Sequence, residues 1–532
     1  MPSALPPEAV GFLALVALAL LPGVLLVRAP WTVVPALSVA FWTLTWWWAP
    51  LEGRGRVLPY ALVAFAVLAV LRVLPKHRVS PPLGYTGPEA PPPVTGPTTG
   101  DVPRLRSVPS LVVVGAALVL LLPLPLWHHL PGREMAFHTT SARLAAWRDA
   151  LPATYEPLLP LPHFGSHAPG FPTLAADVSL LSGLDPGRSV VVTALLSAGL
   201  LLVGLYALLG TRLRPAAAAL GALLGLAAAP WPDFLAVWGE GGPVLALALG
   251  LPAAALLIGH SSRSSAVAAG VLLAGAVLAQ PLLALVIGVV TAVWVSWAGP
   301  GSVIARTNSP GPTPNGEILR RTLNDEAPQD DIRARVTVRR LALAFGVTVV
   351  LAGPALARLA RALSAREAAG VLEEVQGKEL ASFVTGLALV GLAAFLARLL
   401  TDARPRSRVW TAALVAVSVA ILLVSVHAGP AAGQLQPESL RALAGLEAEL
   451  RPLEAVCAPE GVLDWVPALA GRRPGGRGQE GPQPWVPHPL REEWARRVPR
   501  DCSRALDPPV PERSQSLTSG RGTLAARLRS NH

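Results

Sequence analysis

Residues 189–210, SVVVTALLSAGLLLVGLYALLG, form an apolar run of 22 residues without Asp, Glu, Lys or Arg. A helix of about 20 such residues is long enough to cross the hydrocarbon core of a bilayer. In lipid, every backbone N–H and C=O group must be bonded within the segment, and a helix achieves this. Outer-membrane barrels alternate polar and apolar residues, whereas this run does not. The run therefore predicts a transmembrane helix.

Runs of this kind recur along the chain. Hydrophobic residues make up 52% of the sequence and charged residues only 14%, whereas a soluble domain carries roughly 25% charged residues. We therefore predict an all-α polytopic membrane protein with about twelve transmembrane helices. These helices are expected near residues 9–27, 31–50, 57–74, 109–127, 189–210, 215–229, 243–259, 266–280, 282–298, 341–357, 380–400 and 409–427.

The net charge of +11 does not indicate a nucleic-acid partner. Much of the Lys and Arg lies in short loops between apolar runs, where positive charge fixes the orientation of membrane helices. No segment interleaves basic and aromatic residues as a nucleic-acid groove does. Arginine predominates over lysine, and with 55 Pro and 48 Gly this favours a bacterial genome of high GC content. We expect a multi-pass protein of the bacterial cytoplasmic (inner) membrane.

The first apolar run sets the expected orientation. No Lys or Arg precedes it and Arg28 follows it, the reverse of a signal peptide, so we expect an uncleaved helix whose N-terminus lies outside. The cytoplasmic segments are then basic, and the outside loop 230–242 is acidic. This alternation predicts that both termini lie outside, with loop 358–378 as the exception. The cytoplasmic basic residues are Lys76, Arg78, Arg104, Arg106, Arg212, Arg214 and Arg263, followed by those in 306–340 and 404–408.

Composition divides the chain into five parts. We expect N-terminal transmembrane helices in 1–74, a cytoplasmic Pro/Gly-rich linker in 75–108, a transmembrane core in 109–427, an extracytoplasmic tail in 428–507 and disorder in 508–532. Residues 299–339 also resemble a linker. The core contains a long outer loop, 128–188, and long ordered loops tend to be functional. In the tail, leucines at helical spacing predict an amphipathic helix over 437–450.

The two cysteines of the chain, Cys457 and Cys502, both fall in the predicted outside tail. An oxidising compartment favours a disulfide between them. By the chain-entropy estimate, a closed loop of roughly 45 residues contributes about 3–4 kcal/mol. Two free thiols remain the alternative. No His pairs neighbour the cysteines, so a zinc site is not predicted.

The outer loop begins with GREMAFHTTSARL at 132–144. Glu134 and His138 are four residues apart and would share one face of a helix. A carboxylate just above a spanning segment can act as general base toward an acceptor hydroxyl. The alternative is that both are solvated polar residues on a loop helix.

The same loop continues with HFGSHAPGF at 163–171. Pro169 and Gly170 predict a turn before a re-entrant or interfacial helix. His163 and His167 flank this turn, but neither has a Cys or carboxylate at metal-ligand spacing. We predict no metal site here.

The order of these motifs resembles the first extracytoplasmic loop of the GT-C superfamily glycosyltransferases, and most closely their uncharacterised bacterial and archaeal membrane branches. Two later segments are also similar to the family: WGEGGP at 238–243 and DWVPALAGRR at 464–473. The matching loop positions are Glu134, His138, Ala142, Arg143, Tyr155, Pro157, Ala168, Pro169, Gly170, Phe171, Gly183, Leu184 and Pro186.

The resemblance implies transfer of a sugar from a polyprenyl-phosphate carrier to a cell-envelope acceptor on the outer face. It implies that a carboxylate, Glu134 where the family typically has Asp, is the base, with His138 beside it. Arg358 or Arg361 would hold the carrier phosphate, since guanidinium binds phosphate in a bidentate way; snorkelling at the interface is the alternative. Further substrate contacts are expected from Arg143, Tyr155, His163, His167 and Glu240.

Two other classes of protein stay open. A coupled transporter usually has ionisable residues within its spanning helices, and the predicted helices are almost bare of them. A non-catalytic membrane assembly protein agrees with the composition. The sequence indicates no firm cofactor, and a divalent cation is compatible with the chemistry but not indicated.

Overall fold

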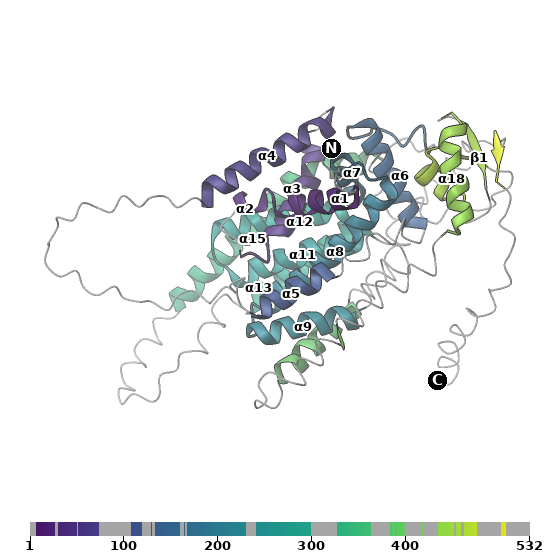
Figure 1. The fold of residues 1–532 in the computed structure, drawn as a ribbon. Helices are drawn as coiled ribbons and strands as arrows, with labels where there is room; N and C mark the ends of the chain where they lie inside the picture. The colour runs from purple at the N-terminus through teal and green to yellow at the C-terminus, as the bar shows by residue number, and fades with distance from the viewer. Residues whose placement is uncertain are drawn as a thin grey trace, which may run out of the picture.

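The computed structural model describes residues 7–26, 30–49, 52–73, 108–119, 129, 133–159, 164, 168–229, 241–298, 327–362, 384–386, 388–399, 417–418, 435–451, 454–458, 462–475 and 502–506. Most of these residues are helical (Figure 1). The helices are α1 (Pro7–Leu20), α2 (Gly23–Leu26), α3 (Val34–Trp48), α4 (Arg54–Val73), α5 (Val108–Val119), α6 (Arg133–Arg148), α7 (Gly170–Ser182), α8 (Pro186–Leu209), α9 (Pro215–Ala228), α11 (Gly241–Gly259), α12 (Arg263–Ala279), α13 (Pro281–Ala298), α15 (Ala327–Ala362) and α18 (Pro437–Glu449).

The predicted apolar runs from 31–50 to 341–357 each contain a helix. Residues 384–386 and 388–399, within the predicted run 380–400, are helical too. Only residues 417–418 of the run 409–427 are described. Helix α15 begins at Ala327, so the prediction of a linker through 339 was wrong. Pro328 lies in the first turn of α15, where its missing N–H costs no helical hydrogen bond.

Four of the described helices are long and apolar enough to cross a membrane: Arg54–Arg72, Pro186–Leu209, Gly241–Gly259 and Arg335–Ala357. Other apolar helices, including α5, α9 and α12, are shorter. The apolar helices indicate a membrane protein. The number of about twelve spans remains a prediction.

The first predicted run, 9–27, is two helices rather than one. Pro22 lies between α1 and α2, and proline lacks the N–H that a continuous helix requires. Helix α3 satisfies the backbone at this break. The Trp42 Nε1 donates a 2.6 Å hydrogen bond to the Leu21 carbonyl, and the Gly23 N–H donates to Ser38 Oγ at 2.8 Å.

Helices α8 and α11 form the centre of the helical bundle, with α12 on the other side of α11 (Figure 1). Leu202 of α8 and Leu247 of α11 are fully buried. Glycine allows the helices to approach closely, because a Cβ at Gly204 would lie 3.0 Å from Pro252 Cδ. Gly221 and Gly225 of α9 pack in the same way against the helical residues 388–399, as small residues four apart do between membrane helices.

Helix α4 lies at the edge of the bundle and exposes apolar side chains (Figure 1). Tyr60, Val63 and Val70 are 78%, 62% and 60% exposed. Apolar side chains on the outside of an apolar bundle are expected where the surrounding solvent is lipid.

Helix α7 marks one end of the bundle, which we term the α7 end. Arg54 at the start of α4 binds Asp177 of α7. The Gly170 Cα at the start of α7 faces the backbone of Leu278 and Ala279, and Gly241 faces Phe171. The starts of α4 and α11 and the close of α12 therefore meet at the α7 end.

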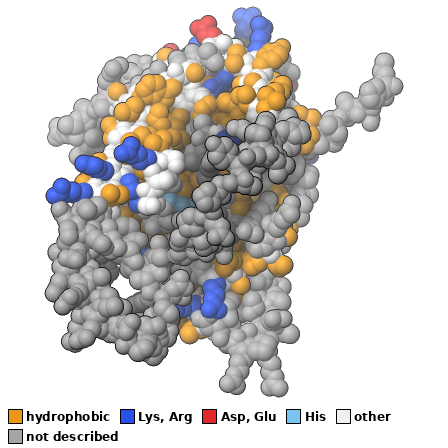
Figure 2. All heavy atoms as spheres, turned by 90° about the vertical axis from the view of Figure 1, so that its left-hand side faces the viewer, with side chains coloured by type: hydrophobic (Ala, Val, Ile, Leu, Met, Phe, Trp, Pro, Cys, Tyr) orange, Lys and Arg blue, Asp and Glu red, His pale blue; other side chains and the backbone are white. Residues whose placement is uncertain are grey.

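At the opposite end, the close of α4 and the close of α11 each contact another helix. The Arg72 Nη1 donates to the Val24 carbonyl at 3.2 Å, joining the close of α4 to α2. Arg340 of α15 donates to the carbonyls of Leu257 and His260, at the close of α11. Figure 2 shows the face that includes this end, with Arg side chains spread among apolar ones and acidic side chains only at the upper rim.

The tail contains α18 and a small parallel sheet. Strands β1 (Ala455–Cys457), β2 (Arg473–Gly475) and β3 (Arg504–Ala505) lie in the order β2-β1-β3. In the register, Val456 is opposite Pro474 on one side and Arg504 on the other. A π-helical turn, η3 (Val466–Ala470), precedes β2. The predicted helix 437–450 corresponds to α18, whereas the all-α prediction missed the sheet, since strands of two or three residues carry no alternating pattern.

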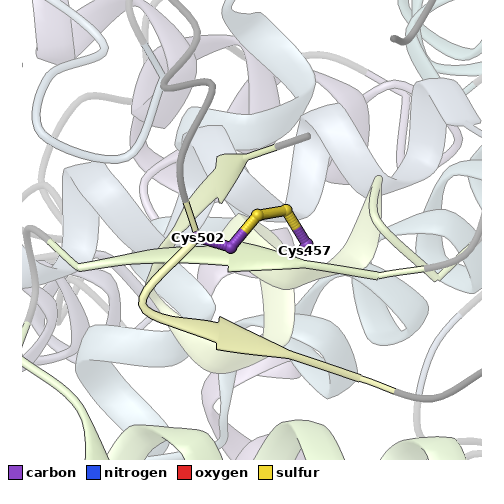
Figure 3. Close-up of a disulfide and its surroundings, with 2 residues drawn as sticks. All are labelled: Cys457 and Cys502. Atoms are coloured by element: carbon purple, nitrogen blue, oxygen red, sulfur yellow. A yellow bond between two sulfur atoms is a disulfide. The ribbon is translucent and has the colours of Figure 1, made fainter. Parts of the chain in front are cut away.

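Cys457 of β1 and Cys502, just before β3, form a disulfide (Figure 3). Their Cα atoms are 5.6 Å apart, within the usual range for a disulfide. The bond therefore covalently joins two segments of the tail that are 45 positions apart in the sequence.

Candidate functional site

The site develops from α6, which carries the motif GREMAFHTTSARL. Glu134 lies in the first turn of α6, and His138 follows one turn later. The description of Glu134 covers its backbone only. The His138 side chain is fully buried, with its ring centroid 5.0 Å from that of Phe171. The alternative in which both residues are solvated is therefore wrong for His138.

Phe171 connects the segment APGF of the outer loop to the segment WGEGGP. It is fully buried at the start of α7, in the segment APGF. Gly241, in the segment WGEGGP, begins α11 directly against this ring, and a Cβ there would overlap with the Phe171 ring atoms. His138, Phe171 and Gly241 thus bring three separate motifs into contact.

Arg143 connects α6 to the tail motif DWVPALAGRR. The Arg143 Nε donates to the Ala468 carbonyl at 2.9 Å and Nη2 donates to the Leu469 carbonyl at 2.8 Å. Gly471 follows η3 with a φ of +60°, and a Cβ there would lie 3.1 Å from Arg143 Nη1. Glycine is therefore suited to this position by both its conformation and its size.

The segment YEP at 155–157 also contacts the tail. Tyr155 is buried, with its ring centroid 5.1 Å from Phe137 of α6 and 4.9 Å from Phe164. The Arg473 Nε donates to the Pro157 carbonyl at 2.7 Å. These contacts attach residues 155–157 to α6 and to the tail.

A further contact joins the start of the outer loop to the tail. The His129 Nε2 accepts a 3.2 Å hydrogen bond from the Leu435 N–H, and its ring lies edge-on to Trp465 with centroids 4.5 Å apart. An acceptor Nε2 requires that this nitrogen is deprotonated. His129 was not among the predicted site residues.

The structure thus brings His138, Arg143 and Tyr155 together in one cluster of loop and tail. Arg143 and Tyr155 are engaged with protein groups there, and a substrate contact by either stays a prediction. Glu134, Arg358 and Arg361 are described by their backbone only, all three within helices. His163, His167 and Glu240 lie outside the described residues.

A buried ion pair between α4 and α7 was not predicted from the sequence. The Arg54 Nε and Nη2 donate to the two carboxylate oxygens of Asp177 at 2.6 and 3.0 Å. The Trp46 Nε1 donates to Asp177 Oδ2 at 3.1 Å, and the Arg54 guanidinium lies 4.2 Å from the Trp46 ring centroid. Burial raises the pKa of Asp177, and the Arg54 charge opposes this shift. An acidic residue within the apolar segment GFPTLAADVSLLS was the available signal.

Among the side chains that the structure describes, no three His, Cys, Asp or Glu groups are arranged to bind a metal ion. Two histidines of the site pack against aromatic rings instead: His138 on Phe171 and His129 on Trp465.

No family model matches the chain, and no curated protein sequence matches it. Solved structures of an oligosaccharyltransferase from Archaeoglobus fulgidus align with it. The complex with Zn and sulfate gives a TM-score of 0.42 at 13% identity, over 68% of this chain and 62% of the other. The structure of the archaeal oligosaccharyltransferase AglB from Archaeoglobus fulgidus, in complex with an inhibitory peptide and a dolichol-phosphate, gives a TM-score of 0.35 at 15% identity. That alignment covers 69% of this chain and 64% of the other.

The chain thus spans less than two thirds of the length of these neighbours.

Proposed function

We propose that the chain is a GT-C-like membrane glycosyltransferase, which moves a sugar from a polyprenyl-phosphate carrier to an acceptor at the α7 end. The main support is that the motifs that resemble the GT-C superfamily lie together in the structure. Three segments of the outer loop, around residues 138, 155 and 171, and the later segment that begins at residue 241 contact one another or the tail segment 464–473. Such convergence supports one site rather than a chance series of short matches.

In this proposal Glu134 is the base that takes the proton of the acceptor hydroxyl. Its backbone lies one helical turn before His138, whose ring is held between α6 and α7. A catalytic group must be held within a fraction of an ångström, and a fully buried neighbour helps to fix the helix that carries it. Glu134 is one methylene longer than the Asp typical of the family, so the backbone of α6 would stand correspondingly farther from the acceptor.

The carrier phosphate would bind near Arg358 or Arg361. Helix α15 reaches the α7 end, because the Trp48 Nε1 at the close of α3 donates to the Leu351 carbonyl at 2.8 Å. Residues 358 and 361 follow in the same helix, about 10–15 Å farther along its axis. Their position supports a phosphate contact at the same end of the bundle as α6.

The α7 end would face away from the cytoplasm, with both chain termini on that side, in the bacterial cytoplasmic membrane. Charge supports this orientation. Arg72, Arg212, Arg263 and Arg335 lie toward the opposite end. Glu52, Asp149, Asp177 and Asp185 all belong to the α7 end or the turns beside it. Basic residues are retained on the cytoplasmic side of membrane helices.

A transfer assay in membrane vesicles with a polyprenyl-phosphate-linked sugar tests the proposal. Glu134→Gln keeps the shape of the side chain and removes the base, so turnover should fall by roughly 10²–10⁴. Glu438→Gln is the matched control, since Glu438 is an exposed tail residue paired with Arg441. Full turnover in the Glu134 variant at normal expression would remove the assigned base. No transfer by the wild-type protein would favour a non-catalytic assembly protein.

A further inference from the structure

The last residue of the turn before α4 and the first two residues of α4, which we together call the turn 53–55, contact the end of α6. The Arg54 N–H donates to the Asp149 carbonyl at 3.1 Å, and the Gly55 N–H donates to the Asp149 carboxylate. Gly53 and Asp149 both have left-handed backbone conformations, with φ of 75° and 53°. Two segments from distant parts of the chain are therefore bonded by one backbone–backbone hydrogen bond and one bond to the Asp149 side chain.

The same turn reaches α7 through the Arg54 side chain. Both carboxylate oxygens of Asp177 are occupied by the guanidinium, and the Trp46 indole closes the arrangement from α3. Arg54 also donates from Nη2 to Thr45 Oγ1 at 2.8 Å. The pair is buried, with Arg54 4% exposed and Asp177 fully buried. A bidentate pair of this kind fixes both distance and orientation.

Through these contacts the turn 53–55 is attached to both outer-loop helices, α6 and α7. One attachment is at the close of α6 and the other is in the middle of α7. At the other ends of these two helices, His138 of α6 contacts Phe171 of α7. The N-terminal helices therefore add a second connection between α6 and α7, separate from the contact that carries the motif residues.

We propose that α3, α4 and the turn 53–55 act as a brace for the outer-loop helices, and that Arg54 is a positioning residue for the site on α6. Its effect on turnover rests on the proposed function, whereas its effect on α6 and α7 does not. Without Arg54, Asp177 would remain buried without its charged partner, which is strongly unfavourable. Helix α7 would then shift or open, and a displacement of about 1 Å at a reacting group can lower turnover roughly a hundredfold.

The test compares Arg54→Gln with Arg72→Gln in the full-length protein. Arg72 lies on the same helix and also binds backbone carbonyls, but at the opposite end. Hydrogen exchange followed by mass spectrometry should show faster exchange, by roughly tenfold or more, in residues 133–148 and 170–182 of the Arg54 variant only. The exchanged pair Arg54→Asp with Asp177→Arg should restore slow exchange in part.

Two readouts separate the brace from the proposed function. Unchanged exchange in α6 and α7 of Arg54→Gln would overturn the brace, whatever the activity. If the wild type transfers sugar, the positioning role predicts that Arg54→Gln has a lower kcat and a nearly unchanged KM for the carrier. A kcat of Arg54→Gln equal to that of Arg72→Gln would overturn the positioning role. If the wild type transfers nothing, the proposed function fails while the exchange comparison still decides on the brace. If Arg54→Gln does not fold, Arg54→Lys replaces it in the test, because lysine keeps the charge but cannot form the bidentate pair.

Discussion

Arg143 and Ala468 are 325 positions apart in the chain, yet the Arg143 Nε donates a 2.9 Å hydrogen bond to the Ala468 carbonyl. The neighbouring Leu469 carbonyl accepts from Nη2 of the same side chain. A single guanidinium on the outer-loop helix thus satisfies consecutive carbonyls of the tail, and the position of the tail depends on it.

Arg143→Met should therefore lower the free energy of unfolding by about 1–3 kcal/mol, because two partly buried carbonyls lose a charged donor. Hydrogen exchange should increase in residues 462–475. Arg148→Met is the control. Arg148 is exposed, and its described hydrogen bond is to the Glu156 carbonyl. Equal losses of stability in the two variants would contradict the role given to Arg143.

Gly241→Ala should destabilise the protein by about 1–3 kcal/mol, the usual cost of overpacking. The added methyl group would overlap with the Phe171 ring, which is itself fully buried. Gly346→Ala in α15 is the control, because no atom lies within 4 Å of a Cβ placed there. Thermal unfolding in detergent measures both, and a neutral Gly241 variant would show that α7 moves away at little cost.

Loss of the Cys457–Cys502 disulfide should loosen the tail. The chain-entropy estimate for a loop of this length is about 4 kcal/mol, and β3 is joined to β1 next to the bond. Cys457→Ser with Cys502→Ser should therefore increase exchange in residues 454–475. In the unreduced wild type a thiol-reactive maleimide should find no target, and labelling there would argue against the bond.

The proposed orientation predicts opposite labelling of two turns. Glu52→Cys, in the exposed turn bound to the end of α6, should react with a membrane-impermeant maleimide in intact cells. Arg212→Cys, in the exposed turn between α8 and α9, should react only after the membrane is permeabilised. The natural cysteines are joined to each other and do not compete. Labelling of both variants in intact cells would defeat the orientation.

Acid should weaken the opposite end through His260. Burial and the Arg340 charge lower the pKa of His260 below its ordinary 6.5. The unfolded chain therefore takes up this proton at a higher pH than the folded chain does, so stability decreases as the pH falls through 6.5. Between about pH 7.5 and about pH 5.5 the melting temperature should fall further for wild type than for His260→Gln. Equal falls would assign the acid sensitivity to other groups.

The helices could be predicted because a membrane helix is specified by its own residues. The run 189–210 corresponds to α8, and the leucines of 437–450 correspond to α18, since length and periodicity are local properties. The Arg54–Asp177 pair could not be predicted in the same way. Its members are 123 positions apart, and each alone resembles an ordinary polar residue beside an apolar segment.

The candidate site shows the same division. The spacing of Glu134 and His138 predicted that both belong to one helix, and α6 contains both. The His138 ring packs against Phe171, which in turn packs against the glycine that begins α11, and neither residue lies near His138 in sequence. The tail sheet could not be predicted for a related reason. Its strands are too short to show an alternating pattern, and they come from three separate segments.

The break between α1 and α2 has a consequence for biosynthesis. The Leu21 carbonyl and the Gly23 N–H are satisfied by Trp42 and Ser38, which the ribosome adds later. Until those residues emerge, the first apolar segment carries two unsatisfied backbone groups, which hydrocarbon does not tolerate. The segment can therefore move from the translocon into lipid at low cost only together with α3. The stable unit that this part of the nascent chain forms is thus a helical hairpin of α1, α2 and α3 rather than a single helix.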